Sequence, residues 1–296
     1  MTGGHRLACQ MGVLPDHEMS HMEKFKLCIL FGDSPDLDPA QIAPGWEMAE
    51  IPVGLVVRPF DSETTWEARC ATIQSWHLPP IKVASHFIHD WGLTPIGPTA
   101  DWDQLNFWSE RALRRLGDLG VEAAGVYGNF FTIPEGVSPT RGQDDAIRWV
   151  NILADYAEKY NVKIALEPTA EPQTLFPMYL DAIEFARKEI GRDVVRVMAD
   201  LNYFIKGNQP LEHIARDPAY CLHVHIAGEN GQPGVGDRVG IHTQLFRVLR
   251  DIHYTGGVST ACPWVSTSGA KKVDFRAETS KSLVYLRNLR EQVYAE

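Results

Sequence analysis

The sequence predicts a single (β/α)₈ barrel. Short aliphatic runs, typical of buried strands, alternate with helical stripes along the whole chain of 296 residues, and this alternation indicates a parallel sheet. About eight such units in a chain of this length are the number that closes a barrel. No glycine-rich phosphate loop follows the first predicted strand, which argues against a doubly wound nucleotide-binding fold.

Each predicted element rests on hydrophobic spacing. Strands are clearest in the second half of the chain, at 162–166, 194–199, 221–227 and 258–262, and weaker in the first half, at 26–31, within 48–57, at 81–88 and at 121–127. Helices are predicted where apolar residues recur at helical spacing, at 104–119, 144–160, 178–190 and 243–252. Gly120, Asn161 and Gly191 follow three of these helices, where a left-handed cap is expected.

We expect one domain. No Pro-, Ser- or Gly-rich linker divides the chain, so residues 23–296 are assigned to the barrel. Residues 1–22 lack the apolar centre of a signal peptide and are expected to form a flexible N-terminal extension. The cytoplasm is therefore the expected location.

Composition excludes several classes of partner. The formal net charge of −10 repels phosphate backbones and argues against nucleic-acid binding. No run of about 18 apolar residues is present, so no membrane-spanning segment is expected. The five cysteines are scattered and form no CxxC pair, which favours buried thiols in a reducing compartment over disulfides.

Polar residues end three consecutive predicted strands. Glu167, Asp200 and His225 each stand where an aliphatic run stops, and in a barrel the three would meet at the C-terminal mouth. Two carboxylates and an imidazole suit one divalent metal ion, Mn²⁺, Mg²⁺, Co²⁺ or Zn²⁺. Such an ion can hold two oxygens of a polyol or hydroxyketone and acidify a neighbouring C–H.

Each of the three residues also has an ordinary structural explanation. An acid after a strand is commonly the N-cap of the next helix, and a single histidine on a strand is commonly a hydrogen-bonded core residue. Taken together, on successive strands and in register, they favour a site.

At these positions the chain resembles the xylose isomerase-like TIM barrels, a family that includes sugar isomerases, ketose 3-epimerases, inosose dehydratases and endonuclease IV. Order and spacing agree from Phe25 to Tyr294. Four segments carry the resemblance: Ile164-Ala-Leu-Glu-Pro-Thr169, Val197-Met-Ala-Asp-Leu-Asn-Tyr203, Leu222-His-Val-His-Ile-Ala-Gly-Glu-Asn230 with Pro233-Gly-Val-Gly236, and Gly256-Gly-Val-Ser-Thr-Ala-Cys-Pro-Trp264.

The resemblance to the epimerase branch implies roles for individual residues. Glu167 would bind the metal and move a proton, Asp200 would be the second ligand, and His225 the third, in preference to His223 on the same face of the strand. At the fourth position, where the family has a glutamate, this chain has Cys262. It is either a thiolate ligand or a buried thiol that leaves the position to water, so the usual relay between two glutamates is in doubt.

Two further departures concern the loops. The family's Asp-x-x-His is here Asp200-Leu-Asn-Tyr203, and no arginine follows Glu229-Asn230. Endonuclease IV needs several more histidines and carboxylates for its metal cluster, which, with the negative net charge, argues against a nuclease. Barrels of this kind often pair through their outer helices, so a homodimer or homotetramer is expected.

Other residues are expected to line the pocket, and each has a competing explanation. His86 would shuttle a proton or hold a hydroxyl, or make a structural hydrogen bond, and the same applies to His89. Substrate contacts are also expected from five residues: Glu50, Glu171, His223, Glu229 and Trp264. The competing explanations are interior ion pairing, solvated acids in loops, and core packing.

Three functional hypotheses follow. The first is a metal-dependent isomerase or epimerase of a ketose, keto-sugar or related polyol, in which Glu167 removes the proton next to the carbonyl. The second is a lyase or dehydratase of an inosose or keto-glycoside, which needs one base and one acid and therefore suits Cys262 better. The third is a non-catalytic barrel with a decayed site.

Overall fold

The computed structural model describes residues 22–30, 38–88, 91–234 and 238–296. Within them, eight parallel strands form a closed barrel in sequence order, with β8 paired to β1. The predicted fold class is confirmed. The predicted N-terminal extension lies almost wholly outside the described residues, so its boundary stays a prediction.

The strands follow the predicted aliphatic runs. β2 ends at Pro52, which lacks the N–H that a continuing ladder needs, and the chain turns into the π-helical segment η2 (Val53–Val57). The last strand ends at Thr260, so Cys262 lies beyond it rather than on it. The bounds are β1 Lys26–Leu30, β2 Met48–Pro52, β3 Ile81–Ser85, β4 Ala123–Tyr127, β5 Lys163–Glu167, β6 Val195–Asp200, β7 Cys221–Ile226 and β8 Gly257–Thr260.

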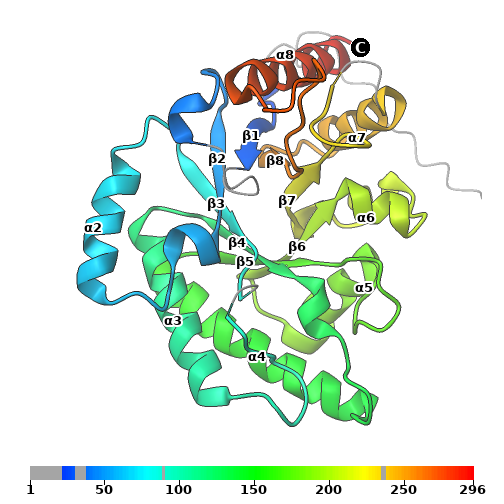
Figure 1. The fold of residues 1–296 in the computed structure, drawn as a ribbon. Helices are drawn as coiled ribbons and strands as arrows, with labels where there is room; N and C mark the ends of the chain where they lie inside the picture. The colour runs from blue at the N-terminus through cyan, green and yellow to red at the C-terminus, as the bar shows by residue number, and fades with distance from the viewer. Residues whose placement is uncertain (1–21, 31–37, 89–90, 235–237) are drawn as a thin grey trace, which may run out of the picture.

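Helices surround the strands (Figure 1). The main ones are α2 Glu63–Gln74, α3 Trp102–Asp118, α4 Pro139–Tyr160, α5 Tyr179–Glu184 with the π-helical η4 Phe185–Ile190, α6 Leu201–Lys206, α7 Val239–Asp251 and α8 Phe275–Tyr294. Short helical turns lie at η1 Pro39–Gln41, η3 Gly128–Phe131, η5 Leu211–Arg216 and η6 Pro218–Tyr220.

Local signals explain where the helices begin and end. Helix α4 starts earlier than predicted because the Ser138 side chain accepts from Arg141 N–H and Pro139 occupies the first turn. Asn161 and Gly191 adopt the expected left-handed conformation, with φ of 55° and 65°. Helices α2, α6 and α8 were not predicted.

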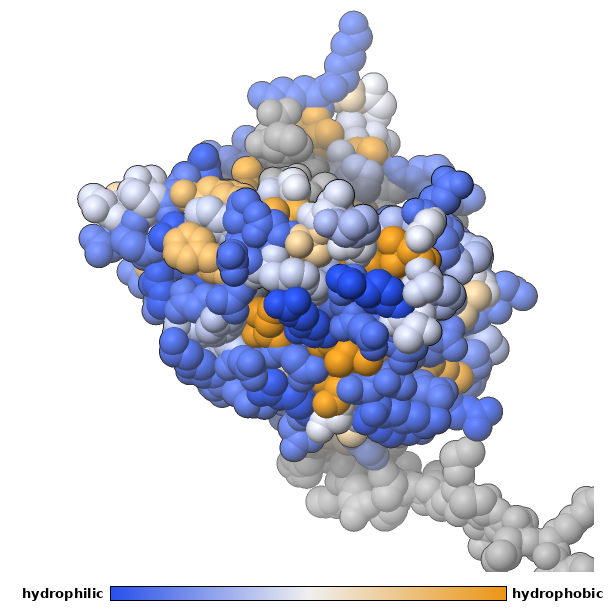
Figure 2. All heavy atoms as spheres, turned by 90° about the horizontal axis from the view of Figure 1, so that it is seen from below, coloured by the Kyte–Doolittle hydropathy of each residue, from blue (hydrophilic) through white to orange (hydrophobic). Residues whose placement is uncertain are grey.

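Apolar packing between the strands and the helices forms the main core. Trp149, Tyr179 and Phe246 are among the largest fully buried side chains, and each such burial contributes about 1.5–3 kcal/mol. The face over α3 and α4 is mostly hydrophilic, with apolar residues in small separate groups (Figure 2). No helix in the described part of the chain is long and apolar enough to cross a membrane.

The described cysteines agree with the expectation of buried thiols. Cys28, Cys221 and Cys262 are buried, Cys70 is partly exposed, and no disulfide joins them. Burial raises the pKa of the Cys221 thiol to about 12, so this thiol stays protonated. Cys9 lies outside the described residues.

Inside the barrel the packing is polar. Barrels of this type are usually filled by Val, Ile and Leu, whereas here Glu50, His223, His225 and Ser259 point inward and are at most 2% exposed. His225 pairs in register with Asp200 on one side and Ser259 on the other, so these side chains share one level of the barrel.

An ion pair ties the last helix to the first strands. Arg290 on α8 donates to the Phe25 carbonyl (2.6 Å) and to Glu47 Oε2 (2.6 Å), which also accepts from Leu27 N–H (2.7 Å). Burial alone would raise the pKa of Glu47, but the hydrogen bonds from Arg290 and Leu27 hold it below its ordinary value. The pair therefore helps to hold α8 against β1.

We predict that Glu47→Gln lowers the free energy of unfolding at neutral pH by about 1–2 kcal/mol, because a partly exposed, charge-assisted hydrogen bond is lost. A carboxylate with a lowered folded-state pKa stabilises above its unfolded pKa, and this contribution is lost as pH falls through the lowered value. Glu47→Gln should therefore flatten the acid side of the stability–pH curve, measured by urea unfolding. Glu23→Gln, in an exposed pair with Lys26, is the control; equal effects of the two substitutions would contradict the prediction.

Candidate metal centre

The ends of three neighbouring strands bring two carboxylates and an imidazole together. Glu167 ends β5, Asp200 ends β6, and His225 lies on β7 opposite Asp200. One ligand atom from each lies within 4.8 Å of the others, and all three residues are buried. The predicted trio is thus assembled at the C-terminal mouth, although its role as a ligand set stays a prediction.

The spacing of the atoms fits a small divalent ion. His225 Nδ1 lies 3.4 Å from Glu167 Oε1 and 3.4 Å from Asp200 Oδ2. Two ligands about 2.1 Å from one ion are about 3.4 Å apart at a tetrahedral angle and about 3.0 Å apart at an octahedral one, so only a small adjustment separates the two geometries. Oxygen and imidazole donors at this separation are compatible with Mn²⁺, Mg²⁺, Co²⁺ or Zn²⁺.

Asp200 caps a helix, one of the two roles considered from the sequence, and its position leaves the other role, metal ligand, open as a prediction. Its Oδ1 accepts from Asn202 N–H (2.7 Å) and caps α6, while Oδ2 faces His225. Because the two oxygens serve different partners, the helix cap fixes the orientation of the oxygen that faces the imidazole.

The electrostatics of the centre favour a cation. Burial raises the pKa of Glu167, and the nearby Asp200 charge adds to this effect. Burial would lower the pKa of His225, but Glu50, Asp200 and Glu167 together hold it well above its ordinary value. Three buried carboxylates around one imidazole leave excess negative charge, which a divalent ion would balance.

A second buried group, Glu50, His223 and His225, shares His225 with the first, and its atoms are also close enough to hold a metal ion. Glu50 Oε2 lies 2.9 Å from His223 Nε2, and Glu50 Oε1 lies 3.0 Å from His225 Nε2. Burial would raise the pKa of Glu50, but the two histidines hold it well below its ordinary value. Glu50 is thus hydrogen-bonded to both histidines inside the barrel, and either contact is an ion pair only when that imidazole is protonated. Substrate binding by Glu50 and His223 stays a prediction.

Two tyrosines that the sequence analysis did not assign to the pocket stand beside Glu167. Tyr127 ends β4 opposite Glu167 in register, and the Tyr203 hydroxyl on α6 donates to the Tyr127 hydroxyl (3.0 Å). Burial and the Glu167 charge raise the pKa of Tyr203, so it remains a hydrogen-bond donor. Tyr127 follows the same rule of a polar group at a strand end that identified Glu167.

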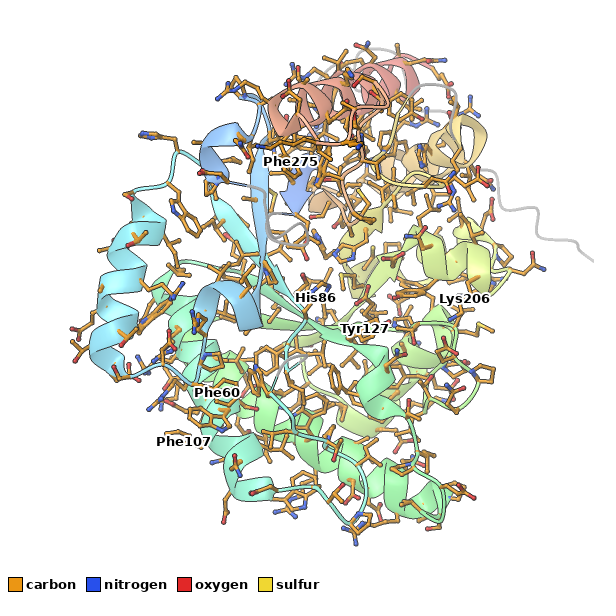
Figure 3. All side chains as sticks on the ribbon, in the orientation of Figure 1. Phe60, His86, Phe107, Tyr127, Lys206 and Phe275 are labelled. Carbon is orange, nitrogen blue, oxygen red and sulfur yellow. The ribbon has the colours of Figure 1, made fainter. Side chains whose placement is uncertain are left out.

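His86 lies near the same carboxylate. It follows β3 directly, adopts φ of 58°, and its charge would lower the pKa of Glu167. His86 and Tyr127 lie near the middle of the barrel in Figure 3, whereas Phe107 lies on its outer side. His89 is outside the described residues. The catalytic role of His86 stays a prediction.

The remaining predicted residues are Cys262, Glu171, Glu229 and Trp264. Among the described residues, Cys262 belongs to neither of the groups that could hold a metal ion, although it is buried. Glu171 pairs with Lys206, a cation at the mouth that the sequence analysis missed. Glu229 is exposed, and Trp264 is part of the buried core. Their assignments as ligand or substrate contacts stay predictions.

A glycine permits the close approach of β4 and β5 at the site. A Cβ atom on Gly128 would lie 2.3 Å from the Glu167 carbonyl oxygen, a contact that real side chains do not make. Gly128 therefore sets how near the chain after β4 can come to the end of β5, and thereby where Glu167 stands.

We predict that Gly128→Ala destabilises the protein by about 1–3 kcal/mol, because the backbone must move to relieve the overlap. The same shift should displace Glu167 and weaken binding of a divalent ion. Thermal unfolding and metal titration measure the two effects. Gly240→Ala is the control, since a Cβ there meets nothing within 4 Å; Gly128→Ala behaving like Gly240→Ala would refute the prediction.

Comparisons with known proteins agree with this geometry. No curated protein sequence matches the chain significantly. Among solved structures, a D-psicose 3-epimerase with D-tagatose from Clostridium cellulolyticum H10 has a TM-score of 0.69 at 19% identity, covering 90% of this chain and 99% of that one. The 3-keto-D-glucoside 4-epimerase YcjR from E. coli has a TM-score of 0.66 at 20% identity, covering 90% and 100%.

A third similar structure is the IOLI protein with a bound zinc atom, with a TM-score of 0.63 at 16% identity, covering 92% of this chain and 98% of that one. At these identities the likeness establishes the fold. The sequence model of the xylose isomerase-like TIM barrel matches residues 67–289, which is most of the chain. The chain therefore belongs to the xylose isomerase-like TIM barrel family.

Proposed function

We propose that the protein is a divalent-metal-dependent isomerase or epimerase of a ketose, keto-sugar or related polyol. The observation that carries the proposal is the convergence of Glu167, Asp200 and His225 at the C-terminal mouth, where barrels of this type build active sites. The names of two similar structures, a ketose 3-epimerase and a keto-glucoside 4-epimerase, support the substrate class.

When bound, the ion would polarise a substrate carbonyl and its neighbouring hydroxyl. Glu167 would remove the proton on the carbon next to that carbonyl. Bound to the ion through one oxygen in its buried place, Glu167 would keep its second oxygen to accept that proton. Tyr127, whose hydroxyl accepts from Tyr203, would donate a hydrogen bond to a substrate oxygen, and His86 would hold a hydroxyl or pass on a proton.

The donor set bears on the choice of metal. Two carboxylates and one imidazole are harder ligands than a thiolate, and Cys262 lies outside the group, which favours Mn²⁺ or Mg²⁺ over a sulfur-bound Zn²⁺ site. We infer a small-molecule sugar or polyol substrate and retain a homodimer or homotetramer as the expected assembly.

A lyase is the second candidate, and one observation favours it. Among the described residues, Glu167 is the only glutamate grouped with Asp200 and His225, so an opposing second glutamate is not available there. Elimination needs one base and one acid to protonate the leaving group, and the tyrosine pair or His86 would supply the acid.

We predict about one divalent ion per chain in the purified protein, measured by elemental analysis after dialysis. Glu167→Gln and Asp200→Asn should each lose the ion, because each removes a negatively charged ligand. Glu189→Gln, at an exposed position on η4, should retain it. Wild-type protein that takes up no divalent ion would refute both enzymatic candidates and leave the non-catalytic barrel.

We predict that the metal-loaded enzyme exchanges a substrate C–H for deuterium in D₂O when it is screened with ketoses and inososes. Glu167→Gln should slow this exchange by about 10²-fold or more. A rearranged sugar as product supports the isomerase or epimerase, and loss of water or of an aglycone supports the lyase. Exchange that persists in Glu167→Gln would contradict the assignment of the base.

A further inference from the structure

Glu50 occupies an unusual place for a glutamate. It lies in the middle of β2, 0% of its surface is exposed, and the two histidines that contact its carboxylate come from β7. A carboxylate in a dry interior is costly unless donors satisfy it. Here His223 Nε2 lies 2.9 Å from Oε2, and His225 Nε2 lies 3.0 Å from Oε1 and 3.2 Å from Oε2.

These contacts bear on which nitrogen of His225 keeps its proton when the ring is neutral, as it must be to bind a metal ion. Both ring nitrogens face carboxylates, which only accept hydrogen bonds when ionised. Nε2 lies 3.0 Å from Glu50, closer than Nδ1 lies to Glu167 or Asp200, so the single hydrogen of a neutral His225 belongs on Nε2. A neutral imidazole has one N–H, and the other nitrogen then keeps a lone pair. That other nitrogen is Nδ1, which faces Glu167 and Asp200 at 3.4 Å from each. Only a nitrogen with a lone pair can bind a metal ion.

Glu50 is also held by a second imidazole, that of His223, which is itself fixed by a contact with β8. His223 Nε2 also lies 2.9 Å from Ser259 Oγ, and Ser259 pairs in register with His225 across β7 and β8. The carboxylate therefore lies between two imidazoles on one strand, and its rotation would cost a hydrogen bond to at least one of them. This gives the ring of His225 a fixed orientation as well as a fixed tautomer.

We propose that Glu50 is the positioning residue of the metal centre: it holds His225 in the Nε2-protonated tautomer and so presents Nδ1 to the ion. The inference rests on the proposed metal-dependent function and adds to it a buried carboxylate that acts on the ion through His225. Such carboxylate–histidine–metal arrangements raise the basicity of the ligand, and losing the outer partner costs about 10–100-fold in metal affinity.

The test compares two glutamates that are both buried. Glu50→Gln keeps the shape of the side chain, but an amide is uncharged and one of its two ends is a donor. We expect Glu50→Gln to weaken the binding of Mn²⁺ and Zn²⁺ about 10–100-fold in a competition titration with a chelating dye. Glu278→Gln is the matched control, because Glu278 is 2% exposed and accepts from Gln232 and Thr267 instead; its affinity should equal that of the wild type.

A second measurement uses the unaltered protein, in case Glu50→Gln does not fold. In ¹⁵N-labelled, Zn²⁺-loaded wild type, NMR should show His225 protonated on Nε2, with a slowly exchanging proton, and metal-bound at Nδ1. His225 protonated on Nδ1 would overturn the inference, as would equal metal affinity for Glu50→Gln and wild type. If wild type binds no divalent ion, the proposed function fails together with this inference. If wild type binds the ion and Glu50→Gln binds it equally well, only this inference fails.

Discussion

The site is organised around the contacts of one buried imidazole, that of His225, because both of its ring nitrogens face carboxylates. His225 faces Glu50 through Nε2 and faces Glu167 and Asp200 through Nδ1. Removing three carboxylates from water is unfavourable unless positive charge or donors compensate them. The barrel interior provides those donors on one side of the ring, and a divalent ion would supply the positive charge on the other.

The fold provides this arrangement through the parallel register of its strands. Because carboxyl ends of parallel strands meet at one mouth, Glu167 and Asp200 need only be the last residues of neighbouring strands to approach each other. His225 reaches them from the next strand, and Gly128 allows β4 and β5 to approach closely. The ordinary apolar packing of the helices outside the barrel leaves its interior free for polar side chains.

Much of the fold could be predicted because buried strands and amphipathic helices have characteristic spacing. Asn161 and Gly191 mark helix ends by their tolerance of positive φ. Helix α8 was not predicted because polar residues interrupt its apolar stripe. Its buried face includes Glu278, Thr279, Ser282 and Arg290. Helix α6 is short, and its N-cap is Asp200, whose place at a strand end indicates a metal ligand as readily as a cap.

The site was only partly predictable from the sequence, because some of its residues also fit an ordinary structural role. Glu167, Asp200 and His225 could be identified because polar residues at the ends of aliphatic runs are conspicuous. Tyr127 was missed because an aromatic residue at a strand end is also an ordinary strand former. The role of Glu50 depends on His223, which is 173 residues away in the chain, and on strand pairing across a closed barrel, which local spacing does not reveal.

The most direct test of the account is a crystal structure of the Mn²⁺-loaded protein with the ion located by anomalous scattering. The account predicts one ion bonded to Glu167, Asp200 and His225 Nδ1, with His225 Nε2 still hydrogen-bonded to Glu50. An ion bound instead between Glu50, His223 and His225 Nε2, in the second buried group, would contradict it.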